Sequence, residues 1–219
     1  MNGVLNLTQT PVLVVGVGVM GIGIAQVAAS AGHEVWLYDA KAGAAEAALA
    51  KLGETLQSLQ AKGKLSAEAV AAISARLKVA SSLDDAAHVG LVVEAIVERL
   101  DIKRSLFQDL EKRVSDDCVL ATNTSSISVT AIANGMARPQ RLVGMHFFNP
   151  VPLMKLVEVV HGLQTAPAVA QAVFDLSKAW GKTPVMATST PGFIVNRIAR
   201  PYYAETLALL QEKAATPEV

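Results

Sequence analysis

Short apolar runs alternate with longer amphipathic stretches through the first 150 residues of the chain. The runs at residues 11–15, 90–96 and 118–122 are rich in valine and leucine and contain almost no charge. Uninterrupted runs of this length are typical of strands that are buried on both faces of a parallel sheet. Because stretches with helical periodicity separate them, the pattern predicts an α/β fold, with helices covering both faces of an open, mostly parallel sheet.

The helix expected at residues 100–114 places Phe107 and several leucines on one face. The same pattern places Lys103, Arg104 and Glu111 on the solvent-exposed side of this helix. The other expected elements are strands at residues 34–38, 141–148, 155–160 and 183–187, a helix at residues 167–180, and a last helix that runs toward residue 213 and is offset at residue 201 by a proline.

Residues 42–77 are rich in alanine and charge, and their leucines recur at helical spacing. A turn at Lys62-Gly63-Lys64 separates two helical segments, and Ser66 is placed to cap the second. This pattern predicts a helical hairpin inserted after the second strand. Lys62 and Lys64 have two interpretations: they decorate a solvated turn, or they contact the phosphates of a large anionic substrate.

The first predicted strand is followed by the sequence GVGVMG at residues 16–21. The next predicted strand is followed by Asp39. In a strand, glycine turn, helix and strand of this kind, Gly16 makes the tight turn and Gly18 lets a pyrophosphate approach the backbone. Gly21 lets the helix, expected at residues 22–31, pack against the strand. Asp39 is spaced to bind a ribose diol, which favours NAD over NADP. The sequence therefore predicts a Rossmann-like, doubly wound domain.

Polar residues follow several of the predicted strands at their carboxyl ends, where open α/β sheets bind their ligands. His146 lies at the end of one apolar strand and Glu158 lies within the next. Histidine titrates near neutrality, and a lone buried carboxylate is costly, so pairing the two side chains would satisfy both. The polar residues at or just beyond strand ends are Asp39, Glu94, Asn123, Ser125 and His146.

Composition narrows the function classes. Nineteen basic and nineteen acidic residues give a net charge of zero, which argues against nucleic acid or an anionic membrane surface as partner. The single cysteine, Cys118, lies in an apolar run and is expected in the core. Neither a signal peptide, a membrane span nor a metal-ligand cluster is expected, and the predicted location is the cytoplasm.

Five motifs, in order along the chain, are similar to those of the L-3-hydroxyacyl-CoA dehydrogenase family. They are GVGVMGIGIAQVAA at residues 16–29, LVVEAIVE at residues 91–98, NTSS at residues 123–126, HFFNPVPLMKLVEVV at residues 146–160 and TPGFIVNR at residues 190–197.

The resemblance implies NAD-dependent interconversion of L-3-hydroxyacyl-CoA and 3-ketoacyl-CoA, as in fatty acid β-oxidation. It implies that His146 is the catalytic base, that Glu158 is its partner, and that Ser125 and Asn196 contact the substrate oxygen. It also implies a further set of contacts: Gly16, Gly18, Gly21, Asp39, Glu98, Lys103, Asn123 and Asn149 for the cofactor, with Ser125, Asn149, Lys62 and Lys64 for the acyl-CoA.

The resemblance also predicts how the chain is organised. Residues 1–188 would form the NAD-binding domain, with the helical hairpin at about 42–77, and residues 189–219 would begin a helical domain that makes family members homodimers. With only the first part of that domain in the sequence, the chain is expected to bind NAD and to turn over poorly. Two alternatives stay open: an NAD-binding domain with little or no turnover, and a dehydrogenase of small hydroxy acids.

Overall fold

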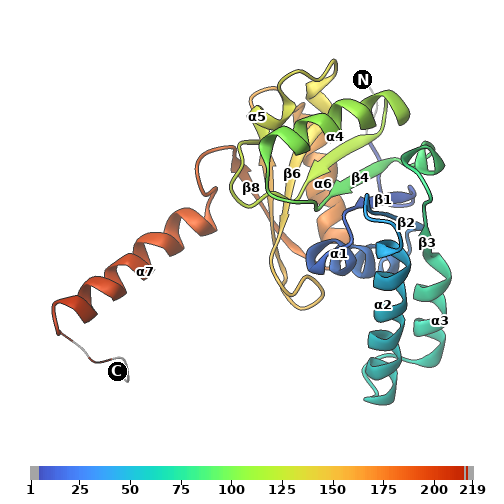
Figure 1. The fold of residues 1–219 in the computed structure, drawn as a ribbon, viewed down its shortest axis with the longest axis horizontal. Coiled ribbons are helices and arrows are strands. Elements are labelled where there is room, and N and C mark those ends of the chain that lie inside the picture. The colour runs from blue at the N-terminus through green and yellow to red at the C-terminus, as the bar shows by residue number, and fades with distance from the viewer. Residues whose placement is uncertain (1–4, 215, 217–219) are drawn as a thin grey trace.

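A computed structural model describes residues 5–214 and residue 216, and it contains an eight-stranded sheet flanked by helices (Figure 1). The strands are β1 (Val12–Val15), β2 (Val35–Tyr38), β3 (Leu77–Val79), β4 (Leu91–Glu94), β5 (Val119–Thr122), β6 (Leu142–Phe147), β7 (Leu156–His161) and β8 (Thr183–Thr188). The helices are α1 (Val19–Ser30), α2 (Ala44–Ala61), α3 (Ala67–Arg76), α4 (Leu100–Arg113), α5 (Val129–Ala133), α6 (Pro167–Ala179) and α7 (Val195–Gln211), with short 3-10 helices at Leu83–Ala86 and Pro139–Arg141.

The strands lie in the order β3-β2-β1-β4-β5-β6-β7-β8, and all neighbours are parallel except β6 and β7. The prediction of a mostly parallel, doubly wound sheet is confirmed. The chain moves outward from β1 in one direction through β2 and β3, and in the other through β4 and β5. This reversal opens a crevice at the carboxyl ends of β1 and β4, where sheets of this type bind ligands.

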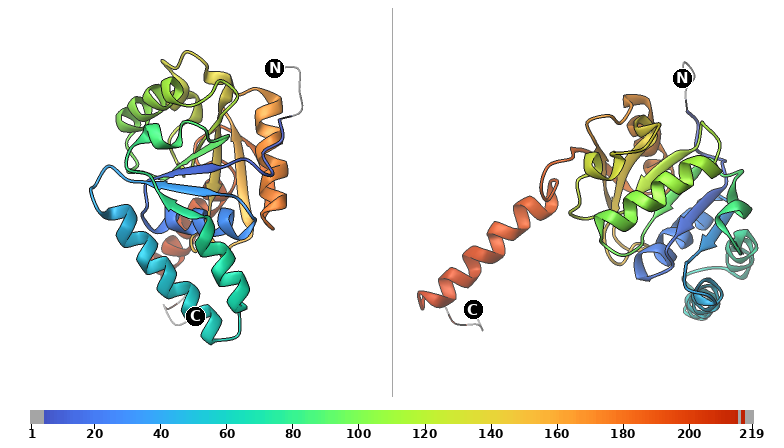
Figure 2. Two further views of the ribbon diagram at one scale, coloured as in Figure 1. Left: turned by 90° about the vertical axis from the view of Figure 1, so that its right-hand side faces the viewer. Right: turned by 45° about the horizontal axis from the view of Figure 1, so that its top comes forward.

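Side chains of one strand enter two separate cores, because successive residues of a strand point to opposite faces. Val12 and Val14 pack in a cluster with α1, α2, α3 and α6. Leu13 and Val15 pack in a second cluster with α4 and α5. Figure 2 shows α4 and α6 on opposite sides of the sheet. Burial on both faces explains the uninterrupted apolar runs of the central strands.

Helix α1 begins at Val19, three residues earlier than the pattern predicts, so Gly21 lies inside its first turns. Glycine disfavours helix by about 1 kcal/mol, which made the glycine-rich segment look like a longer loop. Packing overrides that preference, because a Cβ on Gly21 would overlap the carbonyl oxygen of Gly16. Gly21 therefore permits the close approach of α1 to the end of β1.

The predicted helical hairpin is confirmed as α2 and α3, which extend together from the sheet (Figure 1). Its turn passes through Gly63, whose φ of 67° favours glycine. The Ser66 hydroxyl caps α3 by accepting a hydrogen bond from the Ala69 amide at 3.2 Å. Leu52, Leu56 and Ile73 bury the base of the hairpin against the sheet domain.

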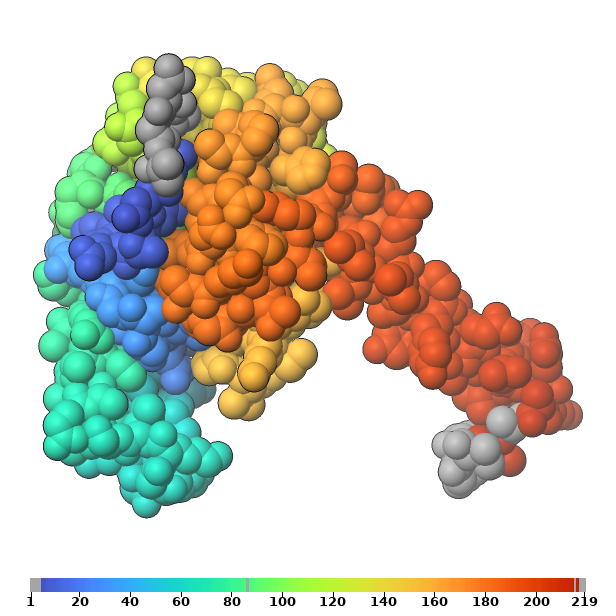
Figure 3. Space-filling model, turned by 180° about the vertical axis from the view of Figure 1, so that it is seen from behind, coloured from blue at the N-terminus to red at the C-terminus, as the bar shows by residue number. Residues whose placement is uncertain are grey.

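Helix α7 leads away from the sheet and has no buried residue (Figures 1 and 3). Among its apolar side chains, Tyr202 and Leu207 are 75% and 66% exposed, and Leu210 is half-buried. Pro201 lies within the helix. Within the described part of the chain, no helix has the length and apolar character that crossing a membrane requires.

Cys118 is buried at the start of β5, as the sequence predicts. Burial among apolar side chains raises the pKa of its thiol to about 12. The thiol is therefore neutral at physiological pH and has the character of a small core residue.

Candidate active site

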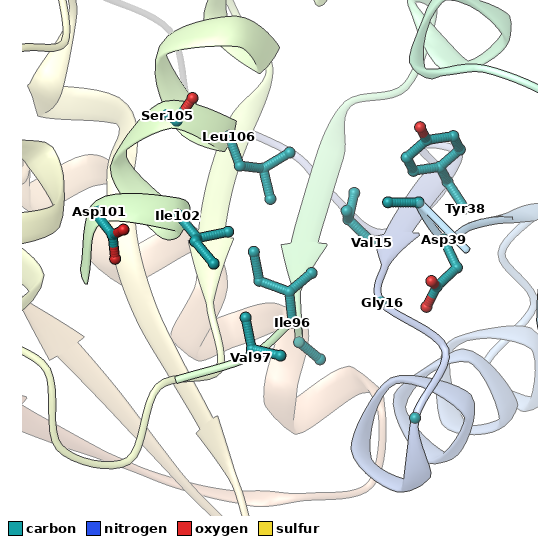
Figure 4. Close-up of a pocket in the computed structure, with 13 residues that line it drawn as sticks. Val15, Gly16, Tyr38, Asp39, Ile96, Val97, Asp101, Ile102, Ser105 and Leu106 are labelled. Atoms are coloured by element: carbon teal, nitrogen blue, oxygen red, sulfur yellow. The ribbon is translucent and has the colours of Figure 1, made fainter. Parts of the chain in front are cut away.

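The first cavity of the site lies in the crevice between β1 and β4 and has a volume of about 710 Å³; we call it the nucleotide cavity (Figure 4). Gly16 and Asp39 border it on one side, while Ile96, Val97 and Ile102 face it from the other (Figure 4). It combines an apolar wall with a carboxylate and a stretch of glycine backbone, which suits a nucleoside attached to phosphates.

The Asp39 carboxylate holds the glycine-rich loop in place. One oxygen accepts a hydrogen bond from the Val17 amide at 3.1 Å, and the other accepts one from the Lys41 amide at 2.9 Å. These bonds fix the orientation of the carboxylate at the end of β2. The carboxylate at this position would repel a phosphate on the ribose, and it would accept a hydrogen bond from a ribose hydroxyl group.

The three glycines of the loop meet different surroundings. Gly16 has a φ of 90°, and a Cβ there would lie 2.6 Å from the carbonyl oxygen of Ala95. Nothing lies within 4 Å of a Cβ built on Gly18. Protein packing therefore requires glycine at positions 16 and 21 but leaves open space over Gly18. That open space, next to the first turn of α1, fits the approach of a pyrophosphate.

His146 on β6 and Glu158 on β7 are directly opposite each other in the antiparallel register. His146 Nδ1 lies 2.6 Å from Glu158 Oε2, and both side chains are buried. Facing residues of antiparallel strands project to the same side, so this register alone brings the two groups together. The ring centroids of Phe148 and Phe193 lie 4.5 Å and 5.8 Å from the centroid of the imidazole ring.

The second oxygen of Glu158 contacts the chain that leads into α7. Oε1 accepts hydrogen bonds from the amides of Ile194 at 2.9 Å and Val195 at 3.0 Å. With His146 on Oε2, both oxygens of this fully buried carboxylate have partners, which is the condition for burying a charge. Sequence reasoning missed these contacts, because no local pattern signals a bond between a strand and a segment 36 residues later.

A cavity of about 440 Å³, which we call the catalytic cavity, exposes His146 to small molecules. It adjoins the nucleotide cavity, since Ala95 and Ile96 line both. The other predicted residues that line it are Glu98, Lys103, Asn123, Ser125, Asn149 and Asn196.

Two of these side chains are held by backbone groups. The Asn196 amide donates to the Ser125 carbonyl at 3.1 Å, so the start of α7 is tied to the loop after β5. The Asn123 carbonyl oxygen accepts from the Phe147 amide at 2.9 Å. Met20 also lines this cavity, so the structure brings residues from all five motifs to one place.

The expectation that Lys103 lies on the solvent-exposed face of its helix is wrong, because its side chain is only 1% exposed. Its ammonium lies 2.5 Å from Glu94 and 3.2 Å from Glu98. Thr122 also donates to Glu94 at 2.7 Å, so the buried carboxylate has several partners. The helical pattern failed here because it cannot show that an acidic residue on a neighbouring strand offers the lysine a buried partner.

The pKa of Glu98 reflects the same cluster. Burial alone would raise it, but a hydrogen bond from the Thr124 hydroxyl and the positive charge of Lys103 outweigh burial, so the pKa is lowered. Glu98 also accepts a bond from the Ser125 amide at 3.2 Å. An ionised carboxylate therefore fixes the loop that carries Ser125.

Lys62 and Lys64 lie exposed at the tip of the hairpin and line none of the cavities described above. A further cavity of about 510 Å³, between α1, α2 and the loop after β6, is instead lined by Lys51 and Thr55, together with Asn149. Lys51 and Thr55 are four residues apart and so share one side of α2, and Lys62 is the C-cap residue of that helix. The sequence did not single out Lys51 or Thr55, although their four-residue spacing was visible.

Within residues 5–214, no group of three or more His, Cys, Asp or Glu side chains is placed to hold a metal ion. The charged groups of the site are instead paired with each other or with backbone. Together, the glycine turn at the sheet crevice, the acidic residue after β2 and the adjoining His–Glu pair define a dinucleotide-dependent oxidoreductase of the Rossmann type.

Comparison with known proteins agrees with that class. Residues 11–190 match the family model described as 3-hydroxyacyl-CoA dehydrogenase, NAD binding domain. A 3-hydroxyadipyl-CoA dehydrogenase of Escherichia coli is 50% identical over 208 residues, which are 95% of this chain and 44% of the relative. A 3-hydroxybutyryl-CoA dehydrogenase of Clostridioides difficile is 42% identical over 205 residues, covering 94% of this chain and 73% of the relative.

A crystal structure of a 3-hydroxybutyryl-CoA dehydrogenase from Escherichia coli superposes with a TM-score of 0.93 at 49% identity; the match covers 95% of this chain and 44% of that chain. The chain thus spans less than half the length of the two Escherichia coli proteins. The family match covers most of the chain, so the chain belongs to the 3-hydroxyacyl-CoA dehydrogenase family, and residues 11–190 form its NAD-binding domain. The resemblance and the cofactor that the sequence predicts are confirmed.

Proposed function

We propose that this chain provides the cofactor site and the catalytic base for NAD-dependent interconversion of L-3-hydroxyacyl-CoA and 3-ketoacyl-CoA. The observation that carries the proposal is the buried His146–Glu158 pair, with 2.6 Å between Nδ1 and Oε2, in a cavity next to the nucleotide cavity. Oxidation of a secondary alcohol needs a base beside a hydride acceptor, and this pair supplies the base.

His146 takes the hydroxyl proton through Nε2, because Nδ1 is occupied by Glu158. The Glu158 carboxylate selects the tautomer with its proton on Nδ1 and stabilises the imidazolium that forms. Bound in the nucleotide cavity, NAD would supply the hydride acceptor for the carbon that bears the hydroxyl group. In the reverse direction His146 returns the proton to the oxygen of the ketone.

Ser125 and Asn196 would hold the substrate oxygen, which orients the alcohol and polarises the ketone. Their support is that both line the catalytic cavity with His146 and are tied together by a hydrogen bond. The remaining residues of this cavity, Glu98, Lys103, Asn123 and Asn149, would face the cofactor, and Asn149 would also contact the thioester.

The CoA part of the substrate would lie along the helical hairpin. Lys51, Thr55 and Asn149 line the cavity beside α2, and Lys62 follows the last residue of that helix at the tip of the hairpin. Lys62 and Lys64 would then meet the phosphates at the far end of CoA. The names of the two relatives above include both 3-hydroxyadipyl-CoA and 3-hydroxybutyryl-CoA, so they leave the acyl group of this chain's substrate open.

We propose the following organisation for the protein. Residues 1–188, including the hairpin at about 42–77, form the NAD-binding domain, and residues 189–219 begin a helical domain through which the protein forms a homodimer. The exposed apolar side chains of α7 support this division. A cytoplasmic location and a role in fatty acid β-oxidation complete the proposal.

A binding function with little turnover is the second candidate. It is favoured by α7, which leaves the sheet without burying any residue and contributes only Asn196, from its first turn, to the lining of the catalytic cavity. Such a chain would bind NAD as the domain requires but would not enclose the reacting atoms from water.

The test is to mix the chain with NADH and acetoacetyl-CoA and to follow absorbance as NADH is consumed. We expect consumption, and we expect His146→Gln to lower kcat by about 10² to 10⁴, the contribution typical of acid–base catalysis. Free acetoacetate serves as the substrate control. NAD binding without turnover would favour the second candidate, and equal rates with the free acid would contradict a thioester substrate.

A further inference from the structure

A cavity of about 570 Å³ lies between the loop after β5 and the start of α7; we call it the arginine cavity. It adjoins the catalytic cavity, because Ser125 and Asn196 line both. A substrate whose hydroxyl group is held at these two residues could therefore extend directly into it. Its other lining residues include Ser126, Gly192, Arg197 and Arg200.

The arginine cavity is positively charged. No acidic residue lines it, and within the described chain neither Arg197 nor Arg200 forms an ion pair with a carboxylate. The described ion pairs engage other cationic side chains, such as Arg99 and Arg113. Both arginine side chains are exposed, and an anion bound between them would be attracted by both positive charges. A guanidinium matches a carboxylate with two parallel hydrogen bonds.

The spacing along α7 sets the distance between hydroxyl and anion. Arg200 follows Asn196 by four residues, so the two side chains lie on the same side of the helix, with Cβ atoms about 5–6 Å apart. Three carbon–carbon bonds of about 1.5 Å each span roughly 4 Å in an extended chain. A carboxyl group three carbons beyond the hydroxyl-bearing carbon would thus come within reach of Arg200 while the hydroxyl group stays at Asn196.

We propose that the arginine cavity binds the terminal carboxylate of a dicarboxylic 3-hydroxyacyl thioester, with Arg200 as the main contact and Arg197 as a second positive charge. Six carbons is the acyl length that the spacing favours. The inference rests on the proposed function, since it uses the same placement of the hydroxyl group at Ser125 and Asn196. It adds a charge requirement at the far end of the acyl chain.

The experiment compares 3-hydroxyadipyl-CoA with 3-hydroxyhexanoyl-CoA, which has the same acyl length but ends in a methyl group. NADH production gives kcat/KM for each thioester, and calorimetry in the presence of NADH gives each Kd. We expect the chain to prefer the dicarboxylic thioester by about ten- to a hundredfold, and we expect Arg200→Met to remove most of that preference. Lys112→Met, which removes a positive charge on the exposed side of α4, is the matched control.

The double variant Arg197→Met/Arg200→Met tests whether either arginine replaces the other. Equal affinity of the unaltered chain for both thioesters would overturn the inference. So would a preference that survives in the double variant, or an equal loss with both thioesters. If neither thioester is oxidised, the proposed function fails, but the preference in Kd still decides for or against the carboxylate site.

Discussion

At the scale of single residues, Glu158 connects the chemistry of the site to its architecture. One oxygen faces His146 and the other accepts the amides of Ile194 and Val195 at the start of α7. A neutral amide cannot accept at both ends, because one of its two groups is an NH₂ donor. Replacement of this carboxylate should therefore disturb the imidazole and the approach to α7 together.

We predict that Glu158→Gln lowers kcat by about 10² to 10⁴, since the imidazolium loses its carboxylate partner. It should also speed hydrogen exchange at the amides of Ile194 and Val195, which mass spectrometry can measure. Glu111→Gln is the control, because Glu111 also accepts backbone amides but lies on α4, away from His146. A lower kcat with unchanged exchange would contradict the double role.

At the scale of elements, the turn from β1 into α1 separates the needs of folding from those of binding. Packing requires glycine at position 21, because a Cβ atom there would overlap the carbonyl oxygen of Gly16. Gly18 has open space around it and a φ of −62°, which any residue can adopt. Gly18 is the N-cap of α1, a position that accepts glycine, and the open space beside it leaves room for a ligand at the start of the helix.

Paired alanine variants test this division. Gly18→Ala should lower the free energy of unfolding by no more than about 1 kcal/mol, the cost of alanine at an N-cap, but raise the Kd for NAD by about tenfold or more, because the methyl group blocks the pyrophosphate. Gly21→Ala should lower the free energy of unfolding by about 1–3 kcal/mol through overpacking. Urea denaturation and calorimetry measure the two quantities. Unchanged NAD affinity in Gly18→Ala would place the pyrophosphate elsewhere.

At the scale of the whole molecule, a hydrogen bond joins two segments of the sheet domain that are 147 positions apart in the sequence. Trp180, at the end of α6, donates to His33 Nε2 at 2.9 Å. His33 Nδ1 in turn donates to the carbonyl of Thr10 at 2.8 Å. Both His33 and Trp180 are buried. The ring is neutral in this arrangement, because one nitrogen accepts while the other donates.

We predict that Trp180→Phe lowers the free energy of unfolding by about 1–3 kcal/mol, because it leaves a buried acceptor on His33 without a donor. Trp36→Phe is the matched control: Trp36 also donates from its indole, but to Glu34, whose carboxylate is partly exposed and can turn to water. Urea denaturation of both variants gives the comparison. Equal losses would mean that ring volume, rather than the hydrogen bond, carries the effect.

Much of the fold could be predicted from local patterns, because buried strands and amphipathic helices can each be recognised within a short segment of the sequence. The site was harder. Asn196 and Ser125 come from separate motifs and meet only through folding. Lys103 was misplaced because its carboxylate partners lie on β4 and the loop after it. Lys51 carried no motif of its own, and it lines a cavity only because α2 passes beside the loop after β6.

The sequence by itself determined the α/β alternation, the glycine turn, Asp39 after the second strand and the hairpin, because each depends on neighbours within a few residues. Only the tertiary structure decided that His146 and Glu158 form a pair. The short connection between β6 and β7 makes these strands antiparallel, and the register sets the two residues opposite each other. A shift of one residue would have turned Glu158 to the other face of the sheet.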